Sequence, residues 1–235
     1  MAFIVPRFAA QPARLILNSM NSTMLITFNF SIIIAATIGL VRFSKIYRAY
    51  QPFIYITLAG FLSELFSEIS IRLYHSNAVV SNIFSMTECI LWLWQFRRWD
   101  GIGNKRWKSE LLVAGLACFW LGENLISGIT HFDSAFSVVY SFCLVFLAIN
   151  QVNHLILEEK SNLLGNAKFL ICAGVIIFYT YRILVESFYI FKLDKSETFM
   201  SNIYYILVFV NLFVNLLYAL ATLWIPTRQR FTLPS

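Results

Sequence analysis

The stretch PFIYITLAGFLSELFSEISIRLY, from Pro52 to Tyr74, decides the fold of this chain. It is long and apolar enough to cross a bilayer as a single helix, which needs about 20 residues. Glu64, Glu68 and Arg72 follow one another at steps of four and therefore lie on one helical face. Charged side chains within hydrocarbon almost always face other protein segments or a watery cavity. The stretch therefore predicts one helix of a membrane-embedded bundle with a polar interior.

The composition extends this interpretation to the whole chain. Of the 235 residues, 59% are hydrophobic and only 13% are charged, whereas soluble proteins carry about 25% charged residues. Charged and proline-containing breaks separate seven apolar runs, each near the length of a spanning helix: 23–43, 52–74, 79–98, 111–130, 135–156, 168–191 and 201–225. We expect an all-α integral membrane protein with seven transmembrane helices, an outer-surface segment at 1–22, a bundle at 23–225 and a short basic tail at 226–235.

The basic residues predict the orientation of the bundle. If the N-terminus is outside, the inner loops carry Arg42, Lys45, Arg48, Arg97, Arg98, Lys105, Arg106, Lys108, Lys160, Lys168, Arg228 and Arg230. The outer side carries only Arg7, Arg14, Arg72, Lys192 and Lys195. Because cytoplasmic loops are enriched in Lys and Arg, this distribution predicts an N-out, C-in protein of a cell membrane, most simply a bacterial inner membrane. The net charge of +6 is thus a topology signal, and we expect no nucleic-acid partner.

A candidate ligand-binding or ion-pair cluster lies in the outer half of the predicted bundle. Its members are polar or charged residues at similar depth on different helices: Glu64, Glu68, Glu88, Glu123, Asn124, Arg182 and Glu186. Five carboxylates and one arginine cannot all be ionised in a low-dielectric site. The set therefore favours a site for a cation, an amine or protons, and the alternative is that the carboxylates pair with arginine only to lock the bundle.

A basic patch follows the third predicted helix on the inner side. It consists of Arg97, Arg98, Lys105, Arg106 and Lys108. Such a patch contacts anionic membrane lipids and sets topology, or it docks a cytoplasmic or membrane protein partner.

An internal duplication is a further hypothesis. The motifs Ser81-Asn82-Ile83-Phe84 and Ser201-Asn202-Ile203-Tyr204 each open a predicted helix, and a similar offset places Glu64 opposite Arg182. A parallel repeat of this kind gives a 3+1+3 arrangement of helices in which Glu64 and Arg182 form an ion pair. This layout resembles those of seven-helix sugar transporters, vitamin-precursor carriers and microbial rhodopsins, and the resemblance is architectural only.

Several kinds of chemistry do not fit the chain. A retinal Schiff base needs a lysine in the last helix, and Met200–Ile225 contains none, so no cofactor is expected. The four cysteines fall in four different predicted helices without a CxxC pair. Neither they nor the three scattered histidines predict a metal site. Because no nucleophile–base spacing is visible, an intramembrane enzyme is the least favoured class.

Three functions are favoured over an enzyme. The first is a receptor-like sensor in which the outer polar cluster binds a small polar or cationic ligand and the inner loops signal through a separate partner. The second is a carrier for a small molecule, with or without proton coupling, whose two halves rock around the cluster. The third is an accessory subunit of a membrane complex.

Overall fold

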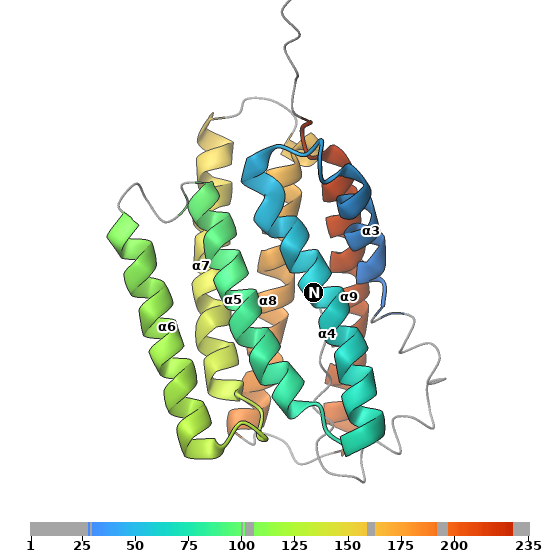
Figure 1. The fold of residues 1–235 in the computed structure, drawn as a ribbon, viewed down its shortest axis with the longest axis vertical. Coiled ribbons are helices and arrows are strands. Elements are labelled where there is room, and N and C mark those ends of the chain that lie inside the picture. Colours follow the sequence, from blue (N-terminus) through green and yellow to red (C-terminus); the bar gives the residue numbers. More distant parts are fainter. Residues whose placement is uncertain are drawn as a thin grey trace, which may run out of the picture.

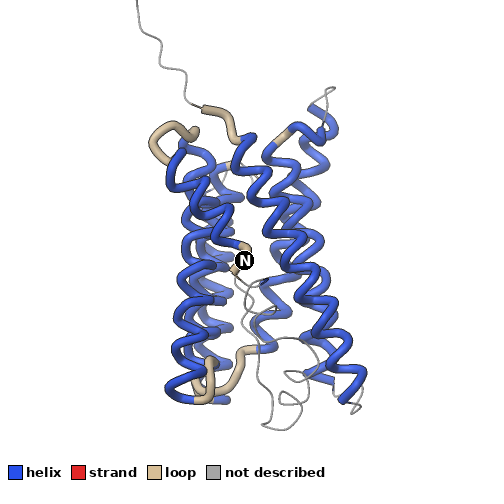
Figure 2. The backbone as a smooth tube through the Cα atoms, turned by 90° about the vertical axis from the view of Figure 1, so that its right-hand side faces the viewer, coloured by secondary structure: helices blue, strands red, loops and turns tan. Residues whose placement is uncertain are grey.

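The computed structural model describes residues 28, 30–99, 101, 106–158, 163–191 and 197–227, with the backbone alone at 106, 158, 189, 197–202 and 204. This part of the chain is all-helical, with helices that run along the long axis and connect at the two ends of the molecule (Figures 1 and 2). The helices are α3 (Ile32–Arg42), α4 (Gln51–Tyr74), α5 (Ala78–Arg98), α6 (Arg106–Ser127), α7 (Ser134–Glu158), α8 (Ala167–Phe191) and α9 (Glu197–Trp224). Short 3-10 turns occur at Arg48–Tyr50 and Leu163–Gly165.

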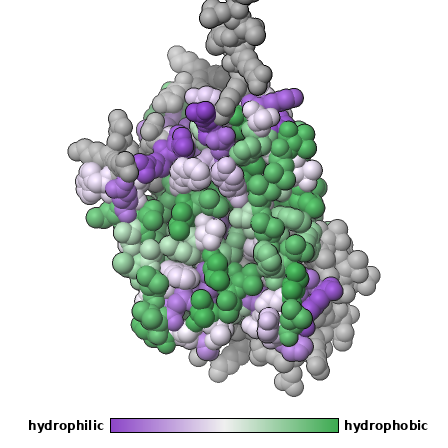
Figure 3. Space-filling model, viewed as in Figure 1, coloured by the Kyte–Doolittle hydropathy of each residue, from purple (hydrophilic) through white to green (hydrophobic). Residues whose placement is uncertain are grey.

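Five of these helices, α4, α6, α7, α8 and α9, are long and apolar enough to span a membrane. The prediction of an all-helical protein with helices suited to a membrane is therefore confirmed, whereas the count of seven spans, the orientation and the repeat are not confirmed. Helix α3 has only 11 described residues, and α5 carries Asn82, Glu88 and Gln95 within its length. Apolar side chains cover the middle of the face in Figure 3, and hydrophilic ones gather toward its ends.

Some predictions fall on residues outside the described part. They are the N-terminal segment 1–22, residues 23–27 and 29 of the first predicted helix, Lys105, Lys160, Lys192, Lys195 and residues 228–235 of the basic tail. For Arg106 and for Ser201, Asn202 and Tyr204 of the second repeat motif, the backbone is described but the side chain is not.

Contacts between neighbouring helices close a ring in the order α3, α4, α5, α7, α8, α9 and back to α3. Helix α6 lies outside this ring, where it packs against α5 and α7 at the edge of the molecule (Figure 1). Helix α5, the polar member, contacts α4, α6 and α7. A helix with this many polar side chains is poorly suited to lipid, and its packing against three others shelters them.

Local sequence explains where several helices begin and end. Pro52 stands in the first turn of α4, where its missing N–H costs nothing. The Gln95 side chain accepts the free N–H of Phe53 at 2.7 Å and donates to the carbonyl of Ala49 at 2.7 Å, which ties the start of α4 to α5. Gly128 ends α6 with a φ of 81°, a left-handed conformation that favours glycine.

A compact aromatic core joins opposite sides of the ring. The rings of Phe53 on α4, Trp92 on α5 and Tyr218 on α9 lie 5.3 to 6.2 Å apart between centroids, and all three side chains are fully buried. Gly174 on α8 faces Tyr218, and any side chain there would collide with the tyrosine ring. Close approach of α8 and α9 therefore depends on this glycine.

A hydrogen-bonded clamp fastens α3 to the end of α9. The Arg42 guanidinium donates to the carbonyls of Thr222, Leu223 and Ile225, and the bond to Ile225 measures 3.1 Å. Carbonyls in the last turn of a helix lack intrahelical partners, so a cation placed there satisfies them and favours the helix dipole. The backbone bridge between Ile46 and Thr227 extends the clamp beyond both helices.

Candidate functional site

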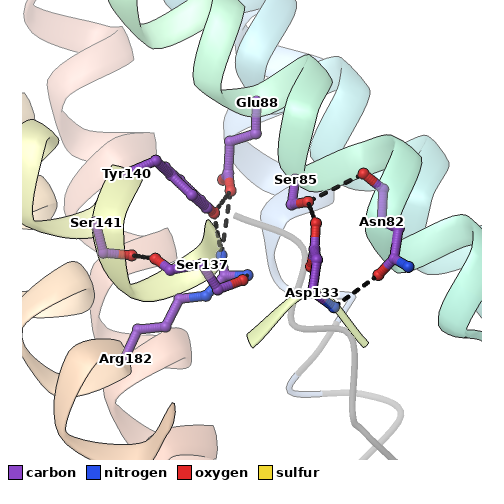
Figure 4. A network of polar contacts seen from close by, with 8 residues as sticks. All are labelled: Asn82, Ser85, Glu88, Asp133, Ser137, Tyr140, Ser141 and Arg182. Carbon is purple, nitrogen blue, oxygen red and sulfur yellow. Dashed lines mark hydrogen bonds and ion pairs between the residues drawn. The ribbon is translucent and has the colours of Figure 1, made fainter. Parts of the chain in front are cut away.

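The centre of the candidate site is a buried ion pair between Glu88 on α5 and Arg182 on α8 (Figure 4). The Nη1 atom of Arg182 lies 3.3 Å from Glu88 Oε2, and the Tyr140 hydroxyl on α7 donates to the same oxygen at 2.9 Å. Arg182 also donates to the Tyr140 oxygen and, through Nη2, to Ser137 Oγ at 3.0 Å. Tyr140 and Ser137 stand one turn apart on α7, so both face the arginine. The pair thus joins three helices.

Burial makes this interaction decisive for the local structure. The Glu88 side chain is only 1% exposed and the Arg182 side chain 14%. Removing one partner of such a pair leaves an uncompensated buried charge, which costs about 3–5 kcal/mol. The guanidinium also lies 5.2 Å from the centroid of the Tyr140 ring, within the range of a cation–π contact.

The ion pair leaves hydrogen-bonding capacity unused. The second Glu88 oxygen, Oε1, is buried without a hydrogen-bond partner, and so are the Tyr179 hydroxyl and Trp92 Nε1. Glu88 interacts electrostatically with Tyr179 on α8 and with Tyr218 on α9, on the other side of the ring. The carboxylate therefore interacts with residues on both sides of the helix ring, and its Oε1 atom has capacity for a further hydrogen bond.

A second polar network fixes the loop between α6 and α7. Asn82 on α5 donates to the carbonyls of Ile129 and His131 at 3.0 and 2.5 Å, and its Oδ1 accepts the N–H of Asp133 at 3.2 Å. Ser85, one turn along α5, donates to Asp133 Oδ2 at 2.5 Å (Figure 4). Asn82 and Ser85 thus hold the loop against α5.

Asp133 in this loop is a titrating group in the neutral range. The pKa of its carboxyl is raised from 3.8 to about 7, mainly by burial and also by the nearby carboxylates of Glu123 and Glu186. The hydrogen bond from Ser85 and the charge of Arg182 lower it in part. The carboxyl therefore gains or loses its proton near physiological pH.

Glu123 on α6 caps a helix other than its own. Its two carboxylate oxygens accept the N–H groups of Ala135 and Phe136 at 3.0 and 2.6 Å. These are the second and third residues of α7, whose N–H groups lack intrahelical partners, and the helix dipole favours a negative charge there. Glu123 therefore anchors the outer α6 to the ring.

Comparison with protein-family models, curated proteins and solved structures found no match.

The structure brings part of the predicted cluster together. Arg182 contacts Glu88 and interacts with Glu186, one turn away on α8, which also bonds to Ser134. Glu123 interacts electrostatically with Glu186.

The other predicted members lie apart from this centre. Asn124 joins the loop network by accepting from Asn82 at 3.3 Å. Glu68 instead pairs with Arg72 at 2.8 Å on the exposed side of α4. Glu64 is buried on α4, and the ion-pair partner that the structure gives Arg182 is Glu88.

The described members of the basic patch are exposed. Arg97, Arg98 and Lys108 all reach solvent, and the Arg98 guanidinium lies 5.8 Å from the Trp94 ring centroid.

The sequence did not predict several residues of the site, among them Ser137, Tyr140 and Asp133. Ser137 and Tyr140 lie on an apolar helix and form the cradle for Arg182, and the i, i+3 spacing of two polar groups there was the available signal. Asp133 stands directly before α7, where an acidic residue usually caps its own helix. Its side chain instead bonds to Ser85 on α5.

Proposed function

We propose that this protein is a receptor-like membrane sensor, with its N-terminus outside, its C-terminus inside, and a small-molecule site around Glu88 and Arg182. Ligand binding at this site alters the packing of α5, α7 and α8, and the change passes to a separate partner at the inner loops. The proposed setting is a bacterial inner membrane, in agreement with the distribution of basic residues.

One observation supports the ligand site above all others. A fully enclosed carboxylate uses one oxygen for Arg182 and Tyr140 and leaves the other without a partner, beside the equally free Tyr179 hydroxyl. Buried polar groups that serve only to hold helices together are normally satisfied in full. A bound ligand, an ion or a water molecule completes unused capacity of this kind.

Helix α5 offers a route from this site to the inner side. Gln95 lies two turns beyond Glu88 on α5 and fixes the start of α4 through Phe53 and Ala49. Arg97 and Arg98 follow in the last turn of the same helix. A shift of α5 that accompanies ligand binding therefore reaches the proposed docking patch without an intervening flexible segment.

The test is a binding screen on the purified protein in lipid nanodiscs. We expect a compound from a library of small polar metabolites to raise the melting temperature, since a ligand that binds only the folded state stabilises it. The double variant Glu88→Gln/Arg182→Gln should lose this shift, and Glu68→Gln, in an exposed ion pair, should keep it. Accumulation of the same compound in proteoliposomes would contradict a sensor.

A carrier is the second candidate, and the order of helices favours it. In the ring, α3 stands opposite α7, α4 opposite α8 and α5 opposite α9, which is the placement that a 3+1+3 repeat with α6 as the linker requires. The Arg42 clamp connects the first half, at α3, to the second half, at α9. Opening that clamp would expose the site to the inner side, and proteoliposome uptake that depends on Arg182 would establish the carrier.

A further inference from the structure

Charge around Arg182 is unbalanced, and this imbalance bears on the class of ligand. Arg182 interacts with three carboxyl groups: Glu88 on α5, Glu186 on α8 and Asp133 in the loop before α7. Glu123 interacts with the N-terminus of α7 through two N–H groups and is compensated there. Among the described residues, Arg182 is the cation that interacts with all three groups, so the cluster carries one more negative than positive charge even when Asp133 is protonated. Low-dielectric surroundings make such an excess costly unless a cation or a proton balances it.

Glu88 and Glu186 also each keep one oxygen without a hydrogen bond. Glu88 Oε1 and Glu186 Oε2 are each buried from solvent and unpartnered, and the whole Glu88 side chain is 1% exposed. A carboxylate is an acceptor only, so the group that completes it must be a hydrogen-bond donor. A positively charged donor satisfies the hydrogen-bonding and the charge requirement together, because charge-assisted hydrogen bonds are the strong ones.

The surroundings favour an organic cation over a metal ion. In the part of the chain that the structure describes, no group of three or more His, Cys, Asp or Glu residues is placed to hold a metal. Glu88 is instead surrounded by aromatic residues from three helices, Tyr140, Tyr179 and Tyr218, and Trp92 lies one turn away on α5. Aromatic rings attract ammonium groups through their quadrupole and pack against an apolar body.

We propose that the ligand of this site is a small organic ammonium ion whose charged nitrogen donates to Glu88 Oε1. Glu186, which also interacts with Arg182, is the second carboxylate that attracts this cation. This inference rests on the proposed function, because it names the chemical class of the ligand at the same site. Arg182 keeps its contacts with Tyr140 and Ser137 when the ammonium binds, so the site is completed rather than dismantled.

The test uses three probes that share a phenyl ring and a two-carbon arm: 2-phenylethylamine, 2-phenylethanol and phenylacetate. Binding to the nanodisc-embedded protein is followed at pH 7 and constant ionic strength by calorimetry and by tryptophan fluorescence. We expect the amine to bind at least about tenfold more tightly than either analogue, a difference that corresponds to one ion-paired hydrogen bond. Glu186→Gln retains the Glu88–Arg182 pair and should weaken the binding of the amine, while the affinities for the alcohol and the acid stay unchanged.

Variants at Glu88 distinguish the loss of a ligand contact from the loss of the folded structure. Glu88→Gln leaves Arg182 buried without its partner, so the double variant Glu88→Gln/Arg182→Gln is measured beside it, and Glu68→Gln is the matched control on an exposed ion pair. Loss of amine binding in the folded double variant, with binding intact in Glu68→Gln, supports the inference.

Two results would overturn it. Tighter binding of phenylacetate than of the amine would show an anion site at Arg182. The sensor proposal would then stand, and the inference of a cationic ligand would be wrong. Absence of amine binding up to about 10 mM, far weaker than specific recognition, overturns the inference as well. The sensor proposal fails separately, if no compound of the metabolite library stabilises the protein.

Discussion

Asp133 gives the protein a pH dependence that can be followed at a single residue. Its pKa of about 7 lies above the ordinary 3.8 because the carboxyl is buried, so the folded protein holds this proton more tightly than the unfolded chain. The contribution of this protonated carboxyl to the free energy of unfolding is complete below about pH 4 and is lost as the pH rises through about 7. We expect Asp133→Asn to remove this component and to raise the melting temperature at pH 8 relative to the unmodified protein.

The measurement is thermal unfolding of both proteins at pH 5 and pH 8 in the same detergent. Asparagine keeps an oxygen that accepts from Ser85, so the hydrogen bond remains while the titration disappears. Ser85→Ala, which removes the hydrogen bond and leaves the carboxyl, serves as the control. An identical change of melting temperature with pH in the variant and the unmodified protein would show that Asp133 does not titrate in this range.

Glu88 and Arg182 should behave as one energetic unit. Glu88→Gln leaves the buried Arg182 without this ion-pair partner, and Arg182→Gln leaves the buried Glu88 carboxylate unpaired. Each variant should therefore lower the free energy of unfolding by about 3–5 kcal/mol. The double variant removes both charges, so its loss should be clearly smaller than the sum of the single losses. Denaturant unfolding of the four proteins completes the cycle, and additive losses would mean that the two side chains do not interact.

At the scale of helices, the contact between α8 and α9 depends on one missing side chain. Gly174 faces the ring of Tyr218, which is itself packed against Phe53 and Trp92. Gly174→Ala should therefore displace a fully buried tyrosine and lower the free energy of unfolding by about 1–3 kcal/mol, as overpacking of a core does. Gly115→Ala on α6 is the matched control, because nothing lies within 4 Å of the added carbon. Equal melting temperatures for the two variants would contradict this contact between Gly174 and Tyr218.

The sequence predicted these helices well because their signal is local. Apolar length and the breaks between runs placed 52–74 within one residue of α4 (Gln51–Tyr74), and 79–98 within one residue of α5 (Ala78–Arg98). Proline in the first turn and charged loops mark such boundaries directly in the chain. The apolar run at 23–43 is described as a helix only from Ile32 to Arg42.

Partners within the site could not be predicted in the same way. Helical spacing gives the depth of a residue and the face that it shares with its neighbours, but not which helix that face meets. Glu68 illustrates this limit, since its four-residue spacing from Arg72 predicted a buried face and produced an exposed local pair. The choice of Glu88 for Arg182 follows from the packing of α5 against α7 and of α7 against α8. No short sequence pattern records this packing.

Over the whole molecule, polar side chains hold the two ends by different means. Arg42 and Gln95 satisfy backbone groups of α9 and α4 at one end, whereas Asn82, Asp133 and Glu123 hold a loop and a helix start at the other. The first kind of contact closes helix ends against each other. The second kind contains a titrating carboxyl and lies beside the ion pair, so this end is the one that responds to pH and, in our proposal, to ligand.

Whether that responsive end faces outward is a question of topology, and cysteine labelling decides it. With Cys89, Cys118, Cys143 and Cys172 replaced by alanine, Ser76→Cys reports the loop between α4 and α5, and Lys45→Cys reports the loop between α3 and α4; both positions are exposed. The excess of Lys and Arg near Lys45 predicts that a membrane-impermeant maleimide labels Ser76→Cys in intact cells and Lys45→Cys only after permeabilisation. The reverse pattern would place the Asp133 loop in the cytoplasm. Glu88 and Arg182 would then be reached from inside, and an outward-facing sensor would no longer be tenable.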